Sequence, residues 1–232
     1  MSDDRTRADP AEELDAIAAA LSHDLRAPLR AIDGFSRILL SDSGAGLPED
    51  TRRYLALVRD AGTEVADLLD DLVEIVRVGR VELAARDGVD PAQLARELIE
   101  AVMAPRAGSR SVAWEVGDVP ACRADPALLR RLLEELLDNA LKFTAGNSAA
   151  RISFGWDADA GAYVVADDGI GVDGDLPAQA YEIFGRLHGR AEFAGTGAGL
   201  AIARRIAARH GGRVWCSGTP GGGARAWFTV AD

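Results

Sequence analysis

The sequence predicts an α+β chain in which an antiparallel helical hairpin, over residues 10–80, precedes an α/β sandwich, over residues 84–232. Two observations support this prediction. In the first third of the chain, apolar residues recur at steps of three or four, which is the period of an α-helix. Beyond Gly79, helical stretches alternate with short strand-like runs, which is typical of one mixed sheet covered by a layer of helices.

The first expected helix runs from about Pro10 to about Leu40, and its apolar stripe contains Leu14, Ile17, Leu21, Leu25, Leu29, Ile32, Phe35 and Leu39. A turn over residues 41–46 follows, with Pro48 expected just inside the second helix. The second stripe contains Tyr54, Leu57, Val58, Ala61, Val65, Leu68, Leu72 and Ile75. Because two helices bury little core alone, we expect a homodimer that forms a four-helix bundle; the alternative is that the hairpin packs on the rest of its own chain.

The sandwich is expected to begin with a helix at Asp90-Pro91, where the aspartate would cap the first turn. The remaining elements follow from the same patterns. The strands are expected at Ser111–Val116, Arg151–Trp156, Ala162–Ala166, Arg213–Cys216 and Ala224–Val230. One helix is expected from Asp125-Pro126 to Phe143, and another over Ala198–His210.

Composition excludes several classes of protein. The formal net charge of −11 argues against a nucleic-acid groove, where basic residues should dominate. No apolar run approaches 18 residues, so we expect no direct insertion into a membrane. Cys122 and Cys216 form no metal, redox or disulfide motif, and the acidic N-terminus lacks a signal-peptide core, so a reducing cytoplasm is expected.

His23 is expected on the polar face of the first helix, beside Asp24. It lies two residues from both Leu21 and Leu25, which turns it about 200° away from each at 100° per residue. A histidine at such a position is ordinarily a solvated surface residue. A neutral imidazole is also a nucleophile, and a neighbouring carboxylate can orient the ring and accept its proton.

A second polar pattern lies in the helix that ends at Phe143. Glu135, Asn139 and Lys142 follow at i, i+4 and i+7 and therefore share one face. Oxygen ligands suit Mg²⁺, and a lysine one turn away suits phosphate groups. The alternative is an ordinary polar helix face.

Two glycine-rich segments complete the set. Asp167-Asp168-Gly169-Ile170-Gly171 ends a strand, where a carboxylate can accept a hydrogen bond from an exocyclic amine such as that of adenine; alternatively, it is an acidic turn. The run from Gly195 to Leu200 (GTGAGL) opens a helix, whose first N–H groups favour phosphate.

In this order and spacing the segments resemble the core of the sensor histidine kinases of two-component signalling, in their phytochrome-like branch. The resemblance covers about residues 12–232. LSHDLRAPL resembles the family's H box, LLEELLDNALKFT its N box, DDGIG its G1 box, YEIFGRLH its F box and GTGAGLAIARRI its G2 box.

The resemblance implies a GHKL-type ATP-binding domain and an ATP-dependent protein histidine kinase. Such an enzyme would phosphorylate His23, with help from Asp24, and pass the phosphoryl group to an aspartate of a response-regulator receiver domain. Asn139 matches the Mg²⁺ ligand, with Glu135 beside it, and Lys142 a phosphate contact. Asp167 matches the adenine-reading carboxylate. The other expected nucleotide contacts are Gly169, Gly171, Arg186, Gly195, Thr196, Gly197, Gly199 and Leu200, with His188 a further candidate in the lid.

Two departures and two rival functions accompany this resemblance. Ala27 stands where family members with strong phosphatase activity carry Thr or Asn, so we expect a poor phosphatase. Only about twenty residues precede His23, so the chain is expected to be part of a longer protein or to take its input from a separate sensor protein. The rival functions are a docking protein without turnover and an ATPase clamp of the same superfold.

Overall fold

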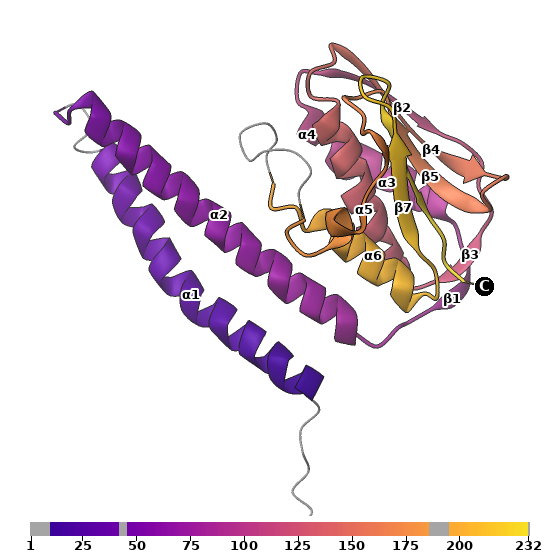
Figure 1. The fold of residues 1–232 in the computed structure, drawn as a ribbon, viewed down its shortest axis with the longest axis horizontal. Helices are drawn as coiled ribbons and strands as arrows, with labels where there is room; N and C mark the ends of the chain where they lie inside the picture. Colours follow the sequence, from indigo (N-terminus) through magenta and orange to yellow (C-terminus); the bar gives the residue numbers. More distant parts are fainter. Residues whose placement is uncertain (1–9, 42–45, 186–194, 232) are drawn as a thin grey trace, which may run out of the picture. The chain divides into compact units, whose positions relative to one another are not determined.

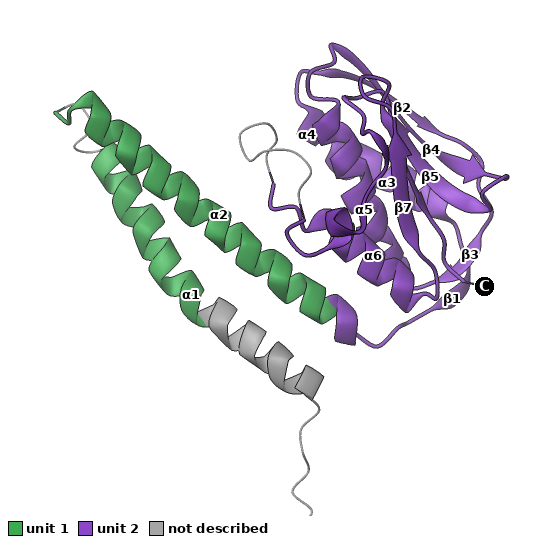
Figure 2. Ribbon diagram, viewed as in Figure 1, with its two compact units in different colours: residues 1–77 green, residues 78–232 purple. Residues whose placement is uncertain are grey.

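A computed structural model describes the backbone of residues 10–41, 46–185 and 195–231, and the side chains of the same ranges from residue 24 onward. The chain divides into two compact units, residues 1–77 and residues 78–232 (Figure 2). The first unit is a hairpin of two long helices, α1 (Pro10–Ser41) and α2 (Glu49–Arg80), which Figure 1 labels. The last turn of α2 belongs to the second unit (Figure 2).

The hairpin confirms both expected helices with one local correction. Pro48 lies directly before α2 rather than inside it, and its carbonyl accepts a hydrogen bond from the Arg52 N–H at 3.1 Å. The guanidinium of Arg26 pairs with Asp70 across the two helices, and Ile32 lies beside Gly62. None of the described helices combines the length and apolarity needed to cross a membrane.

The second unit is an α/β sandwich built on a six-stranded sheet of order β2-β4-β5-β8-β7-β6. Only the β2–β4 pair is parallel, which confirms the mixed sheet. The strands are β2 (Ser111–Val116), β4 (Ala149–Asp157), β5 (Ala162–Asp167), β6 (Gly174–Asp175), β7 (Val214–Gly218) and β8 (Ala224–Phe228).

The expectation of a single sheet was wrong. A second sheet pairs β1 (Arg86–Val89) with β3 (Cys122–Ala124), and neither strand is long enough to show an alternating pattern. Strand β6 was missed for the same reason, because it has only two residues and one is glycine.

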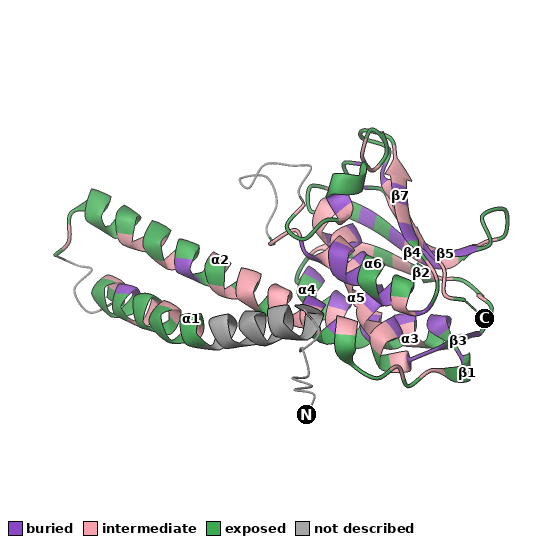
Figure 3. Cartoon of the chain, turned by 60° about the horizontal axis from the view of Figure 1, so that its bottom comes forward, coloured by how far each residue is buried: buried purple, intermediate pink, exposed green. Residues whose placement is uncertain are grey.

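The helical layer contains α3, α5 and α6, and α5 contacts both neighbours (Figure 1). Its elements are α3 (Pro91–Leu98), the π-helix η1 (Ile99–Met103), α4 (Ala104–Ala107), α5 (Pro126–Phe143), the 3-10 helix η2 (Ala178–Tyr181) and α6 (Gly199–Arg209). The core of this unit lies between the layers (Figure 3). It includes Leu133, Leu136, Ile152, Phe154, Ile202, Ile206 and Phe228.

Two aspartates begin the helices of this layer as expected. Asp90 accepts hydrogen bonds from the N–H groups of Ala92 and Gln93, and Asp125 does the same for the first turn of α5. Burial opposes ionisation of Asp125, but the backbone N–H groups that donate to its carboxylate hold its pKa below the usual value. One of those donors is Ala84, 3.0 Å away, so the same side chain fixes the segment before β1.

Candidate functional site

The C-terminal half of α5 presents the polar face that the sequence predicts. Glu135, Asn139 and Lys142 are each half-buried, whereas the leucines on the other side of the helix are buried in the core. The helix is held at its C-terminal end by Arg110, whose guanidinium donates to the carbonyl oxygens of Leu141 and Thr144 at 3.1 and 2.7 Å. This anchor fixes the end of the helix on which Lys142 lies.

The segment before α6 lies directly against this face. A Cβ atom added to Gly199 would collide with the Glu135 carboxylate and would lie 3.7 Å from Asn139 Nδ2. A Cβ atom added to Gly195 would lie 3.4 Å from Lys142 Nζ. The fold therefore brings two sequence-predicted segments together that lie more than fifty positions apart in the chain.

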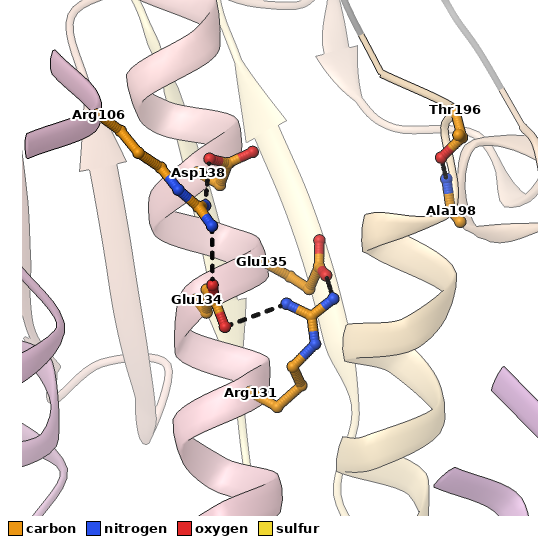
Figure 4. A network of polar contacts seen from close by, with 7 residues as sticks. All are labelled: Arg106, Arg131, Glu134, Glu135, Asp138, Thr196 and Ala198. Carbon is orange, nitrogen blue, oxygen red and sulfur yellow. Dashed lines mark hydrogen bonds and ion pairs between the residues drawn. The ribbon is translucent and has the colours of Figure 1, made fainter. Parts of the chain in front are cut away.

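The first turn of α6 lacks the side-chain cap that α3 and α5 have. Ala198 precedes it, and no described side chain caps it. Thr196 Oγ1 accepts a hydrogen bond from the Ala198 N–H at 3.3 Å, which shapes the loop just before the helix (Figure 4). Uncapped N–H groups at the start of a helix attract anions such as phosphate.

A network of ion pairs lies along α5 beside Glu135 (Figure 4). Arg131 pairs with both Glu134 and Glu135, and Arg106 pairs with Glu134 at 3.2 Å and with Asp138 at 2.9 Å. Arg131 contacts Glu135 Oε1, whereas Oε2 is the oxygen nearest Gly199. The network orients the Glu135 carboxylate toward the loop.

The oxygens of Glu135 and Asn139 fit Mg²⁺ when phosphate groups complete its coordination. Within the described residues, no group of three or more His, Cys, Asp or Glu side chains could hold a metal ion alone. Mg²⁺ typically keeps several waters and binds one or two protein oxygens together with phosphates, so a sparse protein donor set suits it. The absence of a side chain at Gly199 lets the start of α6 approach the Glu135 carboxylate closely.

The segment Asp167–Gly171 follows β5 and lies against the C-terminal end of α5. The Ile170 N–H donates to the Phe143 carbonyl at 3.2 Å, and a Cβ atom on Gly169 would collide with that carbonyl. Asp167 Oδ1 accepts a hydrogen bond from the Gly169 N–H at 2.9 Å. Burial raises the pKa of Asp167 above its usual value despite this bond.

The structure separates the two adjacent aspartates. Asp168 accepts hydrogen bonds from the Arg151 N–H at 3.0 Å and from Asn147 Nδ2 at 3.1 Å, so its carboxylate holds β4 and the loop before it. Asp167 is the more buried of the two. Of the two carboxylates, the geometry favours Asp167 as the one that meets a ligand.

Some predicted residues are not placed in the site. The backbone of His23 lies in α1, but its side chain is outside the described residues, as are Arg186 and His188. Asp24 is exposed on α1. Two other predicted residues are described by the structure in the segment that lies against α5: Gly197 has a φ of +87°, and Leu200 is half-buried in the first turn of α6.

Sequence reasoning missed two contributors to this region. The Tyr181 hydroxyl accepts a hydrogen bond from the Cys216 N–H at 2.7 Å, just beyond the point where β6 stops pairing with β7. The Ala224 N–H, at the start of β8, acts to lower the pKa of Asp167 against the effect of burial. The glycine run before Ala224 is a sequence signal for a close backbone approach there. Nothing in the sequence indicated the hydrogen bond of the Tyr181 hydroxyl.

Two family models match the chain in succession. Residues 13–80 match the His Kinase A (phospho-acceptor) domain, and residues 124–232 match the histidine kinase-, DNA gyrase B-, and HSP90-like ATPase. Among solved structures, full-length ShkA in complex with AMPPNP has a TM-score of 0.62 at 33% identity, covering 93% of this chain and 47% of that one. AdeS, a histidine kinase of Acinetobacter baumannii, shares the fold with a TM-score of 0.55 at 19% identity, covering 90% of this chain and 97% of that one.

Curated relatives extend over nearly the whole chain. The phytochrome-like protein Cph1 of Synechocystis sp. is 30% identical over 220 residues, which cover 94% of this chain and 29% of that protein. The circadian input-output histidine kinase CikA of Synechococcus elongatus is 30% identical over 220 residues, covering 91% of this chain and 29% of that protein. The chain thus spans about three-tenths of the length of these relatives. With both domain matches in the order of the family, the chain belongs to the histidine kinases, as a sensor kinase core of the phytochrome-like type.

Proposed function

We propose that this chain is an ATP-dependent protein histidine kinase that phosphorylates His23 and passes the phosphoryl group to an aspartate of a response-regulator receiver domain. The observation that carries the proposal is the assembly around α5. Gly199 lies on Glu135 and Asn139, Gly195 lies near Lys142, and the Asp167 turn lies against Phe143.

The nucleotide would span these three segments. Asp167 accepts a hydrogen bond from the exocyclic amine of adenine, and Gly169 and Gly171 shape the turn that carries this carboxylate. The first turn of α6 and the loop from Gly195 to Gly199 bind the phosphates, with Thr196, Gly197 and Leu200 in that loop and turn. Lys142 and, from the lid, Arg186 add positive charge.

Mg²⁺ would be held by Asn139 and Glu135 together with phosphate oxygens, and it would offset the charge of the transferred group. Lys142 stabilises the same charge from the next turn of α5. Arg131 keeps the Glu135 carboxylate oriented toward the loop.

The transfer step is a nucleophilic substitution at the γ-phosphorus. A ring nitrogen of His23 forms the new N–P bond as the bond from phosphorus to the bridging oxygen breaks, and ADP leaves. The ring's other N–H proton passes to the Asp24 carboxylate. In the transfer to the receiver, an aspartate oxygen forms the new O–P bond as the N–P bond breaks, and the proton held by Asp24 returns to the ring, which regenerates the neutral imidazole.

The proposal includes a homodimer, in the cytoplasm, with input from a separate sensor or from further domains of a longer protein. The hairpin leaves large apolar side chains exposed on both helices, among them Phe35, Ile38, Tyr54 and Leu57. A second copy would bury them in a four-helix bundle. Because Ala27 cannot hydrogen-bond an attacking water, dephosphorylation of the regulator is expected to be slow.

The test uses γ-labelled ATP with Mg²⁺ and the full chain. We expect acid-labile label on the wild-type protein and on Ser22→Ala, and none on His23→Gln, while ATP binding is equal in all three. Acid-stable label, or label that persists in His23→Gln, would contradict the assignment. Without bound ATP the docking-protein reading would be favoured instead.

A further inference from the structure

Backbone N–H groups from two distant parts of the chain favour the ionised form of the Asp167 carboxylate. The Gly169 N–H belongs to its own turn and donates at 2.9 Å. The Ala224 N–H belongs to the first residue of β8, and it acts to lower the pKa of the same carboxylate against the effect of burial. The carboxylate therefore keeps its orientation only if β8 begins close to the end of β5.

Gly223 permits that close approach. Its φ is +84°, and a Cβ atom there would collide with the Asp167 carbonyl oxygen and would lie 2.9 Å from the Asp168 Cα. Both obstacles are backbone atoms, which cannot rotate away as a side chain could. Only glycine fits this position without a shift of the Asp167 segment or of β8.

The loop before Gly223 fixes the other end of the same turn. A Cβ atom on Gly171 would collide with the Thr219 carbonyl oxygen, and the Gly221 N–H donates to the Ile170 carbonyl at 2.6 Å. The space that Gly171 leaves open is thus filled by the protein itself. The loop over residues 219–223 supports the Asp167–Gly171 turn along its length.

We propose that Gly223 is a positioning residue of the nucleotide site, which sets the Asp167 carboxylate for the exocyclic amine of adenine through the Ala224 N–H. This inference rests on the proposed function. It adds that base selectivity depends on a loop that none of the five family motifs contains. Gly223 itself contacts no substrate; it acts through Asp167.

The experiment compares ATP with inosine triphosphate, which carries a carbonyl oxygen where adenine carries its amine. In Gly223→Ala, affinity for ATP should fall about tenfold or more, as for a lost charge-assisted hydrogen bond, while affinity for inosine triphosphate does not fall. The matched control is Gly161→Ala, at a φ of +60° with no atom within 4 Å of the added Cβ. It places a side chain at a positive φ away from Asp167, without a collision, and should keep the wild-type selectivity.

Equal losses for both nucleotides would overturn the proposal, because they would assign Gly223 to general stability. An unchanged ATP affinity would also overturn it. In an Asp167→Asn background, Gly223→Ala should cause no further loss of ATP affinity. Ala224→Pro removes the same donor without a side chain at residue 223, at the first residue of a strand where proline is tolerated, and should reproduce the loss of selectivity.

A second measurement does not depend on nucleotide binding. Carboxyl-carbon NMR titration should show a higher pKa for Asp167 in Gly223→Ala than in the wild type, because the Ala224 N–H favours the ionised form and would move away from it. An unchanged pKa would contradict the proposal even if ATP binds. If the pKa of Asp167 is raised in Gly223→Ala but the wild-type protein itself does not bind ATP, the positioning role is supported and the proposed function is refuted.

Discussion

The exposed fraction of Phe154 and Phe228 in the α/β unit is 2% and 0%, whereas that of Phe35 in the hairpin is 68%. Within residues 24–41 and 46–77, Ile75 is the one large apolar side chain that is buried, and exposed ones lie on both helices. The α/β unit thus completes its core within one chain, as its two layers allow. The hairpin has a helical pattern of the same quality but no second layer, so its stability should depend on an added partner.

The largest effect should come from the core of the α/β unit. Phe154→Ala removes a ring that stacks on Tyr163 and Phe228, and it should lower the free energy of unfolding of that unit by about 3–5 kcal/mol. ATP binding should weaken as the unit is destabilised, while the dimer persists. Denaturant titration measures the loss of stability, and light scattering measures the oligomeric state. Trp156→Ala, two residues along the same strand but 38% exposed, should cost clearly less. Equal losses for the two variants would contradict the comparison.

The hairpin should respond in the opposite way. Phe35→Asp should leave the unfolding of the α/β unit unchanged but weaken the dimer. Burial of a Phe side chain contributes roughly 1.5–3 kcal/mol, and two copies lose it, so the dimer dissociation constant should rise about a hundredfold or more. Sedimentation equilibrium measures this, with Arg37→Gln at an exposed position of α1 as control. A dimer of wild-type affinity in Phe35→Asp would show that this face is not the interface.

Asp167→Asn should affect ligand binding without harming the fold. ATP affinity should fall about tenfold or more because the substitution removes the charge of the carboxylate. Burial raises the pKa of Asp167 in the folded state above its value in the unfolded chain. As pH rises from the unfolded-state pKa through the folded-state pKa, ionisation of Asp167 therefore lowers the free energy of unfolding. The variant should therefore be at least as stable as the wild type at neutral pH.

The same pKa predicts a pH profile. As pH falls through the raised value, wild-type ATP affinity should drop toward that of Asp167→Asn, because only the ionised carboxylate binds the amine by charge. The ratio of the two affinities at each pH, from calorimetry, removes the titration of the nucleotide itself. A constant ratio from neutral pH into that window would refute the role of Asp167.

The smallest effect is expected at the edge of the sheet. Tyr181→Phe removes the hydroxyl that accepts the Cys216 N–H, and it should cost about 1 kcal/mol in stability. Burial holds the pKa of this hydroxyl well above its usual value, so it remains a neutral acceptor at any working pH. Hydrogen exchange at the Cys216 amide should become faster. Tyr163→Phe, which loses a bond to Pro120, is the control and should leave that amide protected.

Local sequence patterns predicted most of the helices and long strands. Periodic leucines predicted α5, and Asp-Pro pairs predicted the starts of α3 and α5, because caps and amphipathic faces depend on residues one or two turns apart. The strands β1, β3 and β6 escaped, since runs of two to four residues show no period. Their existence depends on pairing with distant segments.

The candidate site shows the same division. The sequence by itself determined the chemical groups and the shared face of Glu135, Asn139 and Lys142, because helical geometry follows from spacing along the chain. Only the tertiary structure decided that Gly199 lies on that face, that the Asp168 carboxylate bonds to Arg151 and Asn147, and that Gly223 must be glycine. These depend on backbone segments far apart in the chain that approach within van der Waals distance. No local pattern encodes such an approach, because it follows from how the whole core packs.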